Sequence, residues 1–124
     1  MRRTLKLAVT MVLLGAPFAG NAAAAQARVR YTPVQYLKNF ALSVCLAEGF
    51  QSDEVKKEAN AAAGGYLELG KFPIEAHEQA AAIAKKYLAM DYPGKSGRQL
   101  TVMKCIDLLH SSELDRLARK YNKK

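Results

Sequence analysis

The side chains best suited to catalysis in this chain are two cysteines, Cys45 and Cys105, and two histidines, His77 and His110. A thiolate beside an imidazole is the arrangement with which cysteine hydrolases attack a carbonyl carbon. Cys105 and His110 are five positions apart, a rotation of about 500° on one helix, so their side chains point to different faces. The spacing therefore argues against a Cys-His pair within this helix.

The same four side chains would supply the ligand count of a zinc site, but zinc ligands usually come in closely spaced pairs. The sequence has no C-x-x-C and no H-x-x-x-H pair. Glu75 and Glu78 share a predicted helix face without the signature of a deep pocket, so paired-carboxylate hydrolysis has no specific support. We expect no metal, no cofactor and no catalytic residue. His110 is better interpreted as a side chain at a helix C-terminus, where a cation complements the helix dipole.

The first 25 residues have the three-part pattern of a secretory signal peptide: a basic start, MRRTLK, an apolar run, and a tract of small residues. Cleavage is possible after Ala25 or Ala27. The apolar run is short against the ~20 residues that a membrane-spanning helix needs, and Pro17 interrupts it. We predict that residues 1–25 are a cleaved signal peptide, that residues 26–124 form one exported domain, and that no stable membrane insertion follows cleavage.

Export determines how the two cysteines are interpreted, because an oxidising compartment favours paired thiols. We predict a disulfide between Cys45 and Cys105, which would leave no thiolate for nucleophilic catalysis. On the loop-entropy model, closing a loop of about 60 residues stabilises a fold by roughly 4 kcal/mol. That is a large fraction of the total stability of so small a domain.

The net charge is moderately positive, which is only weak evidence for an anionic partner. The formal charge of +8 falls to +5 when the three basic residues of the signal peptide leave (8 − 3 = 5). Acidic and basic residues alternate along most of the chain, so we expect no nucleic-acid partner; only the tail, residues 116–124, is mainly of one sign. This tail leaves open an alternative function, a binding or chaperone-like module for an anionic ligand.

Apolar residues recur at helical spacing through the exported chain, and no window alternates as a strand does. Capping residues, prolines and glycines divide this pattern into five predicted helices: 32–48 after the Thr32 cap, 53–67 capped by Ser52 or Asp53, 73–90, 100–109, and 113–121 after a capping box at Ser112. The predicted fold is all-α, a compact bundle of about five helices in which the disulfide joins the first helix to the fourth. The pair Gly64-Gly65 either lets another helix approach closely, which is the interpretation we favour, or weakens the second helix.

The most loop-like stretch lies between the third and fourth predicted helices. It comprises Asp91, Tyr92, Pro93, Gly94, Lys95, Ser96, Gly97 and Arg98. Its Pro-Gly signal and second glycine predict a flexible loop, and loops between long helices are where binding residues are often placed. Tyr92 would be an amphipathic anchor at the tip and Arg98 a forked hydrogen-bond donor. A plain interhelix connection is the alternative that stays open.

Several segments of the chain, in this order, resemble one known family. They are YLKNF at residues 36–40 with CLA at 45–47, YLAMDY at 87–92, KCIDLLHSSELD at 104–115, and the closing KY at 120–121. Together with the signal peptide and the paired cysteines, they resemble the periplasmic immunity proteins that protect bacteria from type VI secretion cell-wall amidases, specifically the fourth amidase immunity family. The resemblance covers nearly all of the exported chain.

The resemblance implies an all-helical, disulfide-containing homodimer in the periplasm. Its partner would be an NlpC/P60-like Cys-His amidase that cuts peptidoglycan between D-glutamate and meso-diaminopimelate. In such proteins the loop between the third and fourth helices fills the substrate groove of the enzyme, and by position this loop is Asp91 to Arg98. The last helix of the second subunit would add contacts. We therefore expect a steric inhibitor that performs no chemistry, with Lys95 and Arg98 pairing with acidic groups in the groove.

Overall fold

Five α-helices make up the computed structural model, which describes residues 29–123. They are α2 (Pro33–Gly49), α3 (Asp53–Leu69), α4 (Ile74–Leu88), α5 (Thr101–Leu109) and α6 (Ser112–Tyr121). The all-α prediction is confirmed. In residues 29–123, no helix is both long enough and apolar enough to span a bilayer. The predicted signal peptide and its cleavage site lie outside the described residues.

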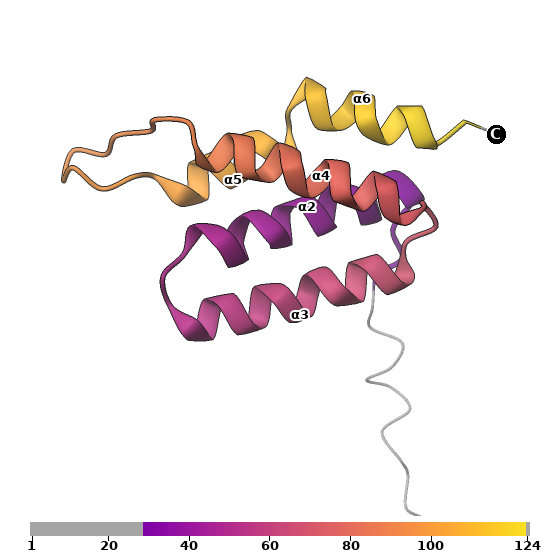
Figure 1. Ribbon diagram of the computed structural model, residues 1–124, viewed down its shortest axis with the longest axis horizontal. Helices are drawn as coiled ribbons and strands as arrows, with labels where there is room; N and C mark the ends of the chain where they lie inside the picture. Colours follow the sequence, from indigo (N-terminus) through magenta and orange to yellow (C-terminus); the bar gives the residue numbers. More distant parts are fainter. Residues whose placement is uncertain (1–28, 124) are drawn as a thin grey trace, which may run out of the picture.

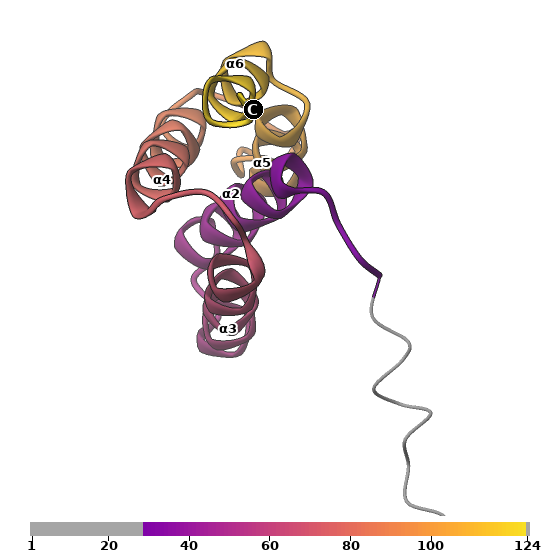
Figure 2. The same ribbon diagram turned by 90° about the vertical axis from the view of Figure 1, so that its right-hand side faces the viewer.

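The central helix is α2, which contacts each of the other four helices. α3 lies along one side of α2, whereas α4, α5 and α6 gather on the opposite side (Figures 1 and 2). The hydrophobic core therefore lies between α2 and the three C-terminal helices, and α3 buries only Ala59 and Ala63.

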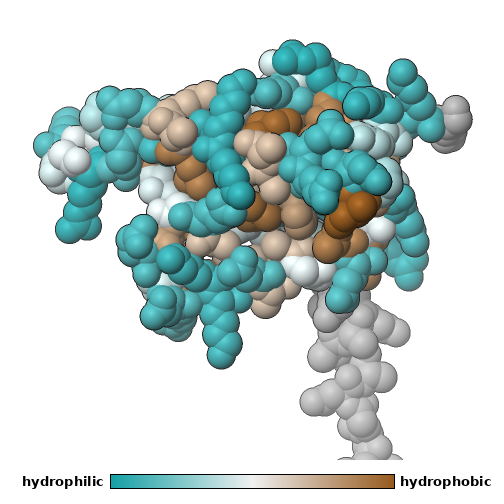
Figure 3. All heavy atoms as spheres, in the orientation of Figure 1, coloured by the Kyte–Doolittle hydropathy of each residue, from teal (hydrophilic) through white to brown (hydrophobic). Residues whose placement is uncertain are grey.

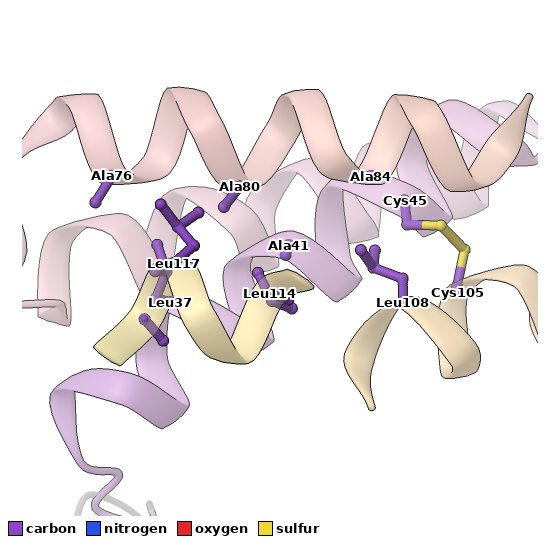
Figure 4. Close-up of a cluster of buried hydrophobic side chains, with 11 residues drawn as sticks. Leu37, Ala41, Cys45, Ala76, Ala80, Ala84, Cys105, Leu108, Leu114 and Leu117 are labelled. Carbon is purple, nitrogen blue, oxygen red and sulfur yellow. A yellow bond between two sulfur atoms is a disulfide. The ribbon is translucent and has the colours of Figure 1, made fainter. Parts of the chain in front are cut away.

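Small side chains line the contact between α2 and α4. Ala76, Ala80 and Ala84 follow one another every fourth residue on α4, and none of them is accessible to solvent. Residues at this spacing share one helix face, and their small size allows a close approach of the backbones. Figure 4 shows them facing the other buried side chains of the core, which are Leu37, Ala41, Cys45, Cys105, Leu108, Leu114, Leu117 and Ala118.

The predicted disulfide is confirmed. The sulfur atoms of Cys45 on α2 and Cys105 on α5 are bonded at 2.06 Å, and both residues are fully buried. The bond closes a chain separation of 60 residues. It therefore fixes α5, a short helix, covalently to the central helix of the fold.

Two of the predicted helix starts are confirmed by their hydrogen bonds. Thr32 Oγ1 accepts from the backbone N–H of Gln35 at 3.2 Å, and Gln35 Oε1 accepts from the N–H of Thr32 at 2.9 Å. This reciprocal pair is a capping box. Ser52 caps α3 by accepting from the N–H of Val55.

The predicted start of α6 was wrong by one residue. The cap is Ser111, whose hydroxyl accepts from the N–H of Leu114 at 3.2 Å. Ser112 instead accepts from Arg116 Nη1, and the carboxylate of Asp115 binds Lys38 on α2. The box predicted from Ser112 and Asp115 does not form because Ser111, not Ser112, is the cap residue.

The predicted role of the glycine pair in α3 was also wrong for the described part of the chain. A Cβ added at Gly64 or Gly65 would meet no atom within 4 Å, because α3 faces its neighbours only along the stripe that holds Ala59 and Ala63. Close approach occurs instead at Gly49. There a Cβ would meet the terminal methyl groups of Thr101 and Leu88, so a larger residue at the end of α2 would have to displace these side chains where α5 begins.

Candidate functional site

The connection between α4 and α5 projects away from the helices as an ordered hairpin (Figure 1). The N–H of Gly94 donates to Arg98 O at 2.8 Å, and the N–H of Leu100 donates to Tyr92 O at 2.9 Å. Between these bonds, Pro93 and Gln99 form an isolated antiparallel bridge. We call residues 91–100 the hairpin. The predicted loop is thus an extended hairpin closed by two backbone hydrogen bonds and one isolated bridge.

Two glycines give the hairpin its turn. The N–H of Gly97 donates to Gly94 O at 3.0 Å, and Gly97 has φ +76°, in the left-handed region that favours glycine. A glycine in this conformation at the end of a three-residue turn is a common hairpin closure. At Gly94, an added Cβ would lie 3.0 Å from Arg98 O. Both glycines that mark the loop in the sequence are therefore needed for its shape.

Gln99 closes the base of the hairpin with its side chain. Gln99 Oε1 accepts from the backbone N–H of Tyr92 at 2.9 Å, and Gln99 Nε2 donates to Asp91 Oδ1 at 2.7 Å. One amide group thereby joins the two strands with two bonds. Sequence analysis missed Gln99, because a single glutamine carries neither a turn signal nor a charge pattern.

Tyr92 lies at the base of the hairpin, and its predicted position at the tip was wrong. Its hydroxyl donates to Asp107 Oδ2 on α5 at 2.8 Å, and its side chain is half-buried. The hydrogen bond to the carboxylate raises the pKa of Tyr92 above the usual value, with burial as a secondary cause. The ring therefore anchors the hairpin to its own fold.

Lys95, Ser96, Gly97 and Arg98 form the exposed tip. In the space-filling view, the end of the molecule that carries the hairpin is a mainly hydrophilic projection (Figure 3). No acidic residue occurs between Asp91 and Asp107, and neither Lys95 nor Arg98 forms an ion pair with a described residue. The tip is a narrow cationic surface that is suited to acidic groups of a partner.

The first turn of α5, which follows the hairpin, is held in place by Lys104 and the disulfide. Lys104 is only 4% exposed, and its Nζ donates to Leu88 O at 2.9 Å. This carbonyl belongs to the last turn of α4, where a cation complements the helix dipole. The next residue, Cys105, bonds α5 to α2. The two ends of the hairpin are thus fixed to one another through the starting turn of α5.

The residues considered for catalysis are not assembled for it. Both cysteines are consumed by the disulfide, which leaves no thiolate nucleophile. His77 is buried with Nδ1 at 3.1 Å from Pro73 O and its ring edge against Phe40, whereas His110 is exposed at the C-cap of α5, as predicted. Residues 29–123 contain no group of three potential metal ligands.

Residues 116–121 of the basic tail lie on α6, beside a shallow groove between α4 and α6. The groove has a volume of about 390 Å³ and is lined by Gln79, Ala82, Ile83, Glu113, Arg116, Leu117 and Lys120. Glu113 in this lining binds Lys86 at 2.8 Å. The surface around the groove therefore mixes both charge signs, so it gives the anionic-ligand alternative no specific support.

Comparison with known proteins gives one family. The family model described as "Tai4: Type VI secretion system (T6SS), amidase immunity protein" matches residues 35–118. A chain in the structure of the effector–immunity system Tae4/Tai4 from Salmonella typhimurium is 41% identical, with a TM-score of 0.70 over 76% of this chain and 93% of that chain. No curated protein matches in sequence.

Two further structures share the fold at lower identity. One is the Salmonella typhimurium effector Tae4 in complex with the immunity protein Tai4 from Enterobacter cloacae, at 23% identity and a TM-score of 0.64 over 71% of this chain and 91% of that chain. The other is the Tae4–Tai4 complex from Enterobacter cloacae, with the same identity and TM-score over 71% and 90%.

Proposed function

This chain belongs to the Tai4 family of type VI secretion system amidase immunity proteins, and from this premise we propose that it inhibits a Tae4-like amidase by inserting the hairpin into the active-site groove. The observation that carries the proposal is the ordered, projecting hairpin with its exposed tip. Inhibition is steric, and this chain supplies no catalytic group. The target is a Cys-His enzyme that cuts peptidoglycan between D-glutamate and meso-diaminopimelate.

The hydrogen bonds within the hairpin suit it to entering a groove. Gly94, Gly97 and Leu100 have backbone donors that are already paired inside the hairpin, so burial in a groove leaves these donors satisfied. The turn is also set before binding, and a preordered loop loses less conformational freedom on association than a flexible one. The hairpin should therefore fill a cleft at a lower cost in conformational entropy than a flexible loop would.

The charges of the tip support an acidic target surface. Lys95 and Arg98 are exposed and have no acidic partner among the described residues. Arg98 offers a planar fork for a carboxylate, and Lys95 a compact charge. We propose that both pair with acidic groups lining the groove of the amidase.

We further propose that the protein is exported to the periplasm behind its signal peptide and acts there as a homodimer. Support for the dimer comes from the outward face of α5, where Val102, Met103 and Ile106 are 51%, 51% and 46% exposed. Such a cluster on a short helix is suited to a second copy. Met103→Lys and Ile106→Lys should yield monomers by light scattering, whereas Leu69→Lys on α3 should not. A monomeric wild type would contradict the homodimer.

The decisive experiment replaces residues 92–96 with a Gly-Ser linker and titrates the variant against the Tae4 effector of Salmonella typhimurium, with peptidoglycan cleavage as the readout. That effector is a suitable probe because it has been crystallised with an immunity protein from another organism. Loss of inhibition with an unchanged melting temperature is the expected result.

The matched control is a Gly-Ser replacement of residues 70–71, which join α3 to α4 at the end of the molecule opposite the hairpin (Figure 1). This variant should inhibit as the wild type does. If the hairpin replacement inhibits equally well, the hairpin has no part in the mechanism.

A further inference from the structure

We propose that Asp107 and Gln99 are positioning residues, which hold the hairpin in the orientation that meets the amidase without touching the enzyme themselves. The inference rests on the proposed function, because it assumes that the hairpin is the inhibitory element. Neither side chain belongs to the exposed tip. Asp107 lies on α5, and Gln99 lies at the base of the hairpin.

At the base of the hairpin, the side chain of Gln99 takes the place of a backbone acceptor. Tyr92 O accepts from the N–H of Leu100, whereas the N–H of Tyr92 has its acceptor in the side chain of Gln99. The same amide group donates to Asp91 on the opposite strand. Glutamine offers both a donor and an acceptor on one planar group, and both are used here. Gln99 therefore sets how the two strands leave the helices.

Asp107 attaches the hairpin to the helical body. Its bond with the Tyr92 hydroxyl is the one side-chain hydrogen bond between residues 91–99 and a helix in the described part of the chain. A hydrogen bond to a charged acceptor is stronger than one between neutral groups. Without this bond, no side-chain hydrogen bond holds residues 91–99 to a described helix, so the hairpin should tilt more freely about its two chain ends.

The helix that carries Asp107, α5, is attached to two other helices. Two residues before it, Cys105 is bonded covalently to α2, and Lys104 donates to the last turn of α4. These two residues point into the core, whereas Asp107 is exposed. The helix α5 thus connects the central helix, through the disulfide, to the base of the hairpin, through Asp107. The orientation of the tip is thereby set by the core of the fold.

The hydrogen bond between Tyr92 and Asp107 has a different role from a contact in the hydrophobic core. Asp107 is exposed, and among residues 29–123 its side chain forms a hydrogen bond with Tyr92 alone, so its loss should leave the packing of the helices unchanged. The effect should appear in the order of the hairpin and in the strength of inhibition. A preordered loop binds more tightly because less conformational freedom is lost on association.

The first test uses the free protein and needs no amidase. Hydrogen exchange of the Gly94 and Leu100 amides, followed by NMR, should quicken about threefold to tenfold in Tyr92→Phe, Asp107→Ala and Gln99→Ala, the range expected for the loss of one hydrogen bond. Exchange of the amides in α2 should stay at the wild-type rate, and the melting temperature should fall only by the small amount expected for one exposed hydrogen bond. Tyr36→Phe and Glu58→Ala, which alter a tyrosine and an acid away from the hairpin, are the matched controls.

The second test measures inhibition of the Salmonella typhimurium Tae4 effector by the same variants. Each should raise the inhibition constant about threefold to tenfold, and the double variant Tyr92→Phe with Asp107→Ala should be no worse than either single one, since both remove the same bond. Asp107→Asn, which keeps an acceptor oxygen, should lie between Asp107→Ala and the wild type.

The outcomes separate the inference from the function on which it depends. If the linker replacement abolishes inhibition while hydrogen exchange and inhibition are unaltered in Asp107→Ala and Gln99→Ala, the positioning role is wrong and the inhibitory hairpin stands. If the exchange rates rise but the linker replacement still inhibits fully, the hairpin is ordered as inferred and the proposed function is wrong.

Discussion

Lys38 on α2 and Asp115 on α6 form an ion pair in which Nζ lies 2.6 Å from Oδ1. The two residues are 77 positions apart in the chain, and their side chains are 20% and 36% exposed. The hydrogen bond from Lys38 lowers the pKa of Asp115, and burial opposes this shift in part. The pair therefore fastens the last helix to the central one and makes this contact dependent on pH.

Asp115→Asn should destabilise the protein by about 0.5–1 kcal/mol at neutral pH, the range for a partly exposed pair. A carboxyl whose pKa is lower in the folded state stabilises that state above its unfolded pKa, and this contribution is lost as the pH falls through the folded value. The difference between wild type and variant should thus shrink as the pH falls below the usual range of an aspartate carboxyl. Urea denaturation at neutral and acid pH measures it, with Glu58→Gln as control; a difference that is constant with pH would contradict the assignment.

Substitution of two helical glycines by alanine should have opposite effects. At Gly49 the new Cβ would lie 2.4 Å from Thr101 Cγ2 and 2.8 Å from Leu88 Cδ2, whereas at Gly64 it would meet nothing within 4 Å. Gly49→Ala should destabilise by about 1–3 kcal/mol through overpacking. Gly64→Ala should stabilise by about 0.5–1 kcal/mol because alanine loses less backbone freedom. Thermal denaturation measures the sign of the stability change in each variant. If Gly49→Ala were stabilising, the chain could not be closely packed at this site.

Structural features that depend on residues close together in the sequence could be predicted from it. The capping box at Thr32 and the apolar spacing of α2 depend on neighbouring residues, and the disulfide followed from export and the number of cysteines. The start of α6 was placed one residue too late because two consecutive serines, Ser111 and Ser112, are both suitable caps and only the structure shows that Ser111 is used. The position of the candidate loop was likewise readable from its glycines.

The internal structure of that loop was not predictable, because the groups that order it act through tertiary contacts. The sequence identifies Tyr92 as an aromatic residue in a loop, but only the fold shows that Asp107 accepts its hydroxyl. Gln99 has no local feature that marks it as a link between strands. Likewise, Lys104 would be expected on the surface, yet it is buried because Leu88 O accepts from its ammonium group.

Reduction of the Cys45–Cys105 bond should lower the stability substantially. The closed loop spans 60 residues, for which the loop-entropy model gives about 4 kcal/mol. A shift to a lower urea midpoint in the presence of a strong reductant is expected, and Cys45→Ala with Cys105→Ala should reproduce it without reductant. Reductant should have no further effect on this double variant. An unchanged midpoint after confirmed reduction would show that packing alone holds α5 in place.

The titration of Tyr92 should depend on Asp107. The carboxylate accepts the phenolic hydrogen bond and raises the pKa of Tyr92, so the neutral phenol is favoured up to a pH above its usual range. The stabilisation is present below the unfolded pKa and is lost as the pH rises through the folded one. The tyrosinate absorbance of wild type minus that of Tyr92→Phe isolates this group. Asp107→Ala should shift that difference titration to lower pH, and Glu58→Ala should not.

The charges of the hairpin tip and of the α6 tail should contribute differently to inhibition. Lys95 and Arg98 belong to the projecting tip, whereas Arg119 and Lys120 are exposed on α6. Lys95→Ala with Arg98→Ala should weaken inhibition of the Salmonella typhimurium Tae4 effector by about tenfold or more, since charge pairs that are buried on binding are each worth more than exposed ones. Arg119→Ala with Lys120→Ala should change it less than about threefold at physiological salt, where exposed charges are screened. Inhibition by the wild type should also persist as salt is raised, because a filled groove excludes ions from the contact. The opposite ranking of the two double variants, with a steep loss of binding in salt, would assign the interaction to the basic tail.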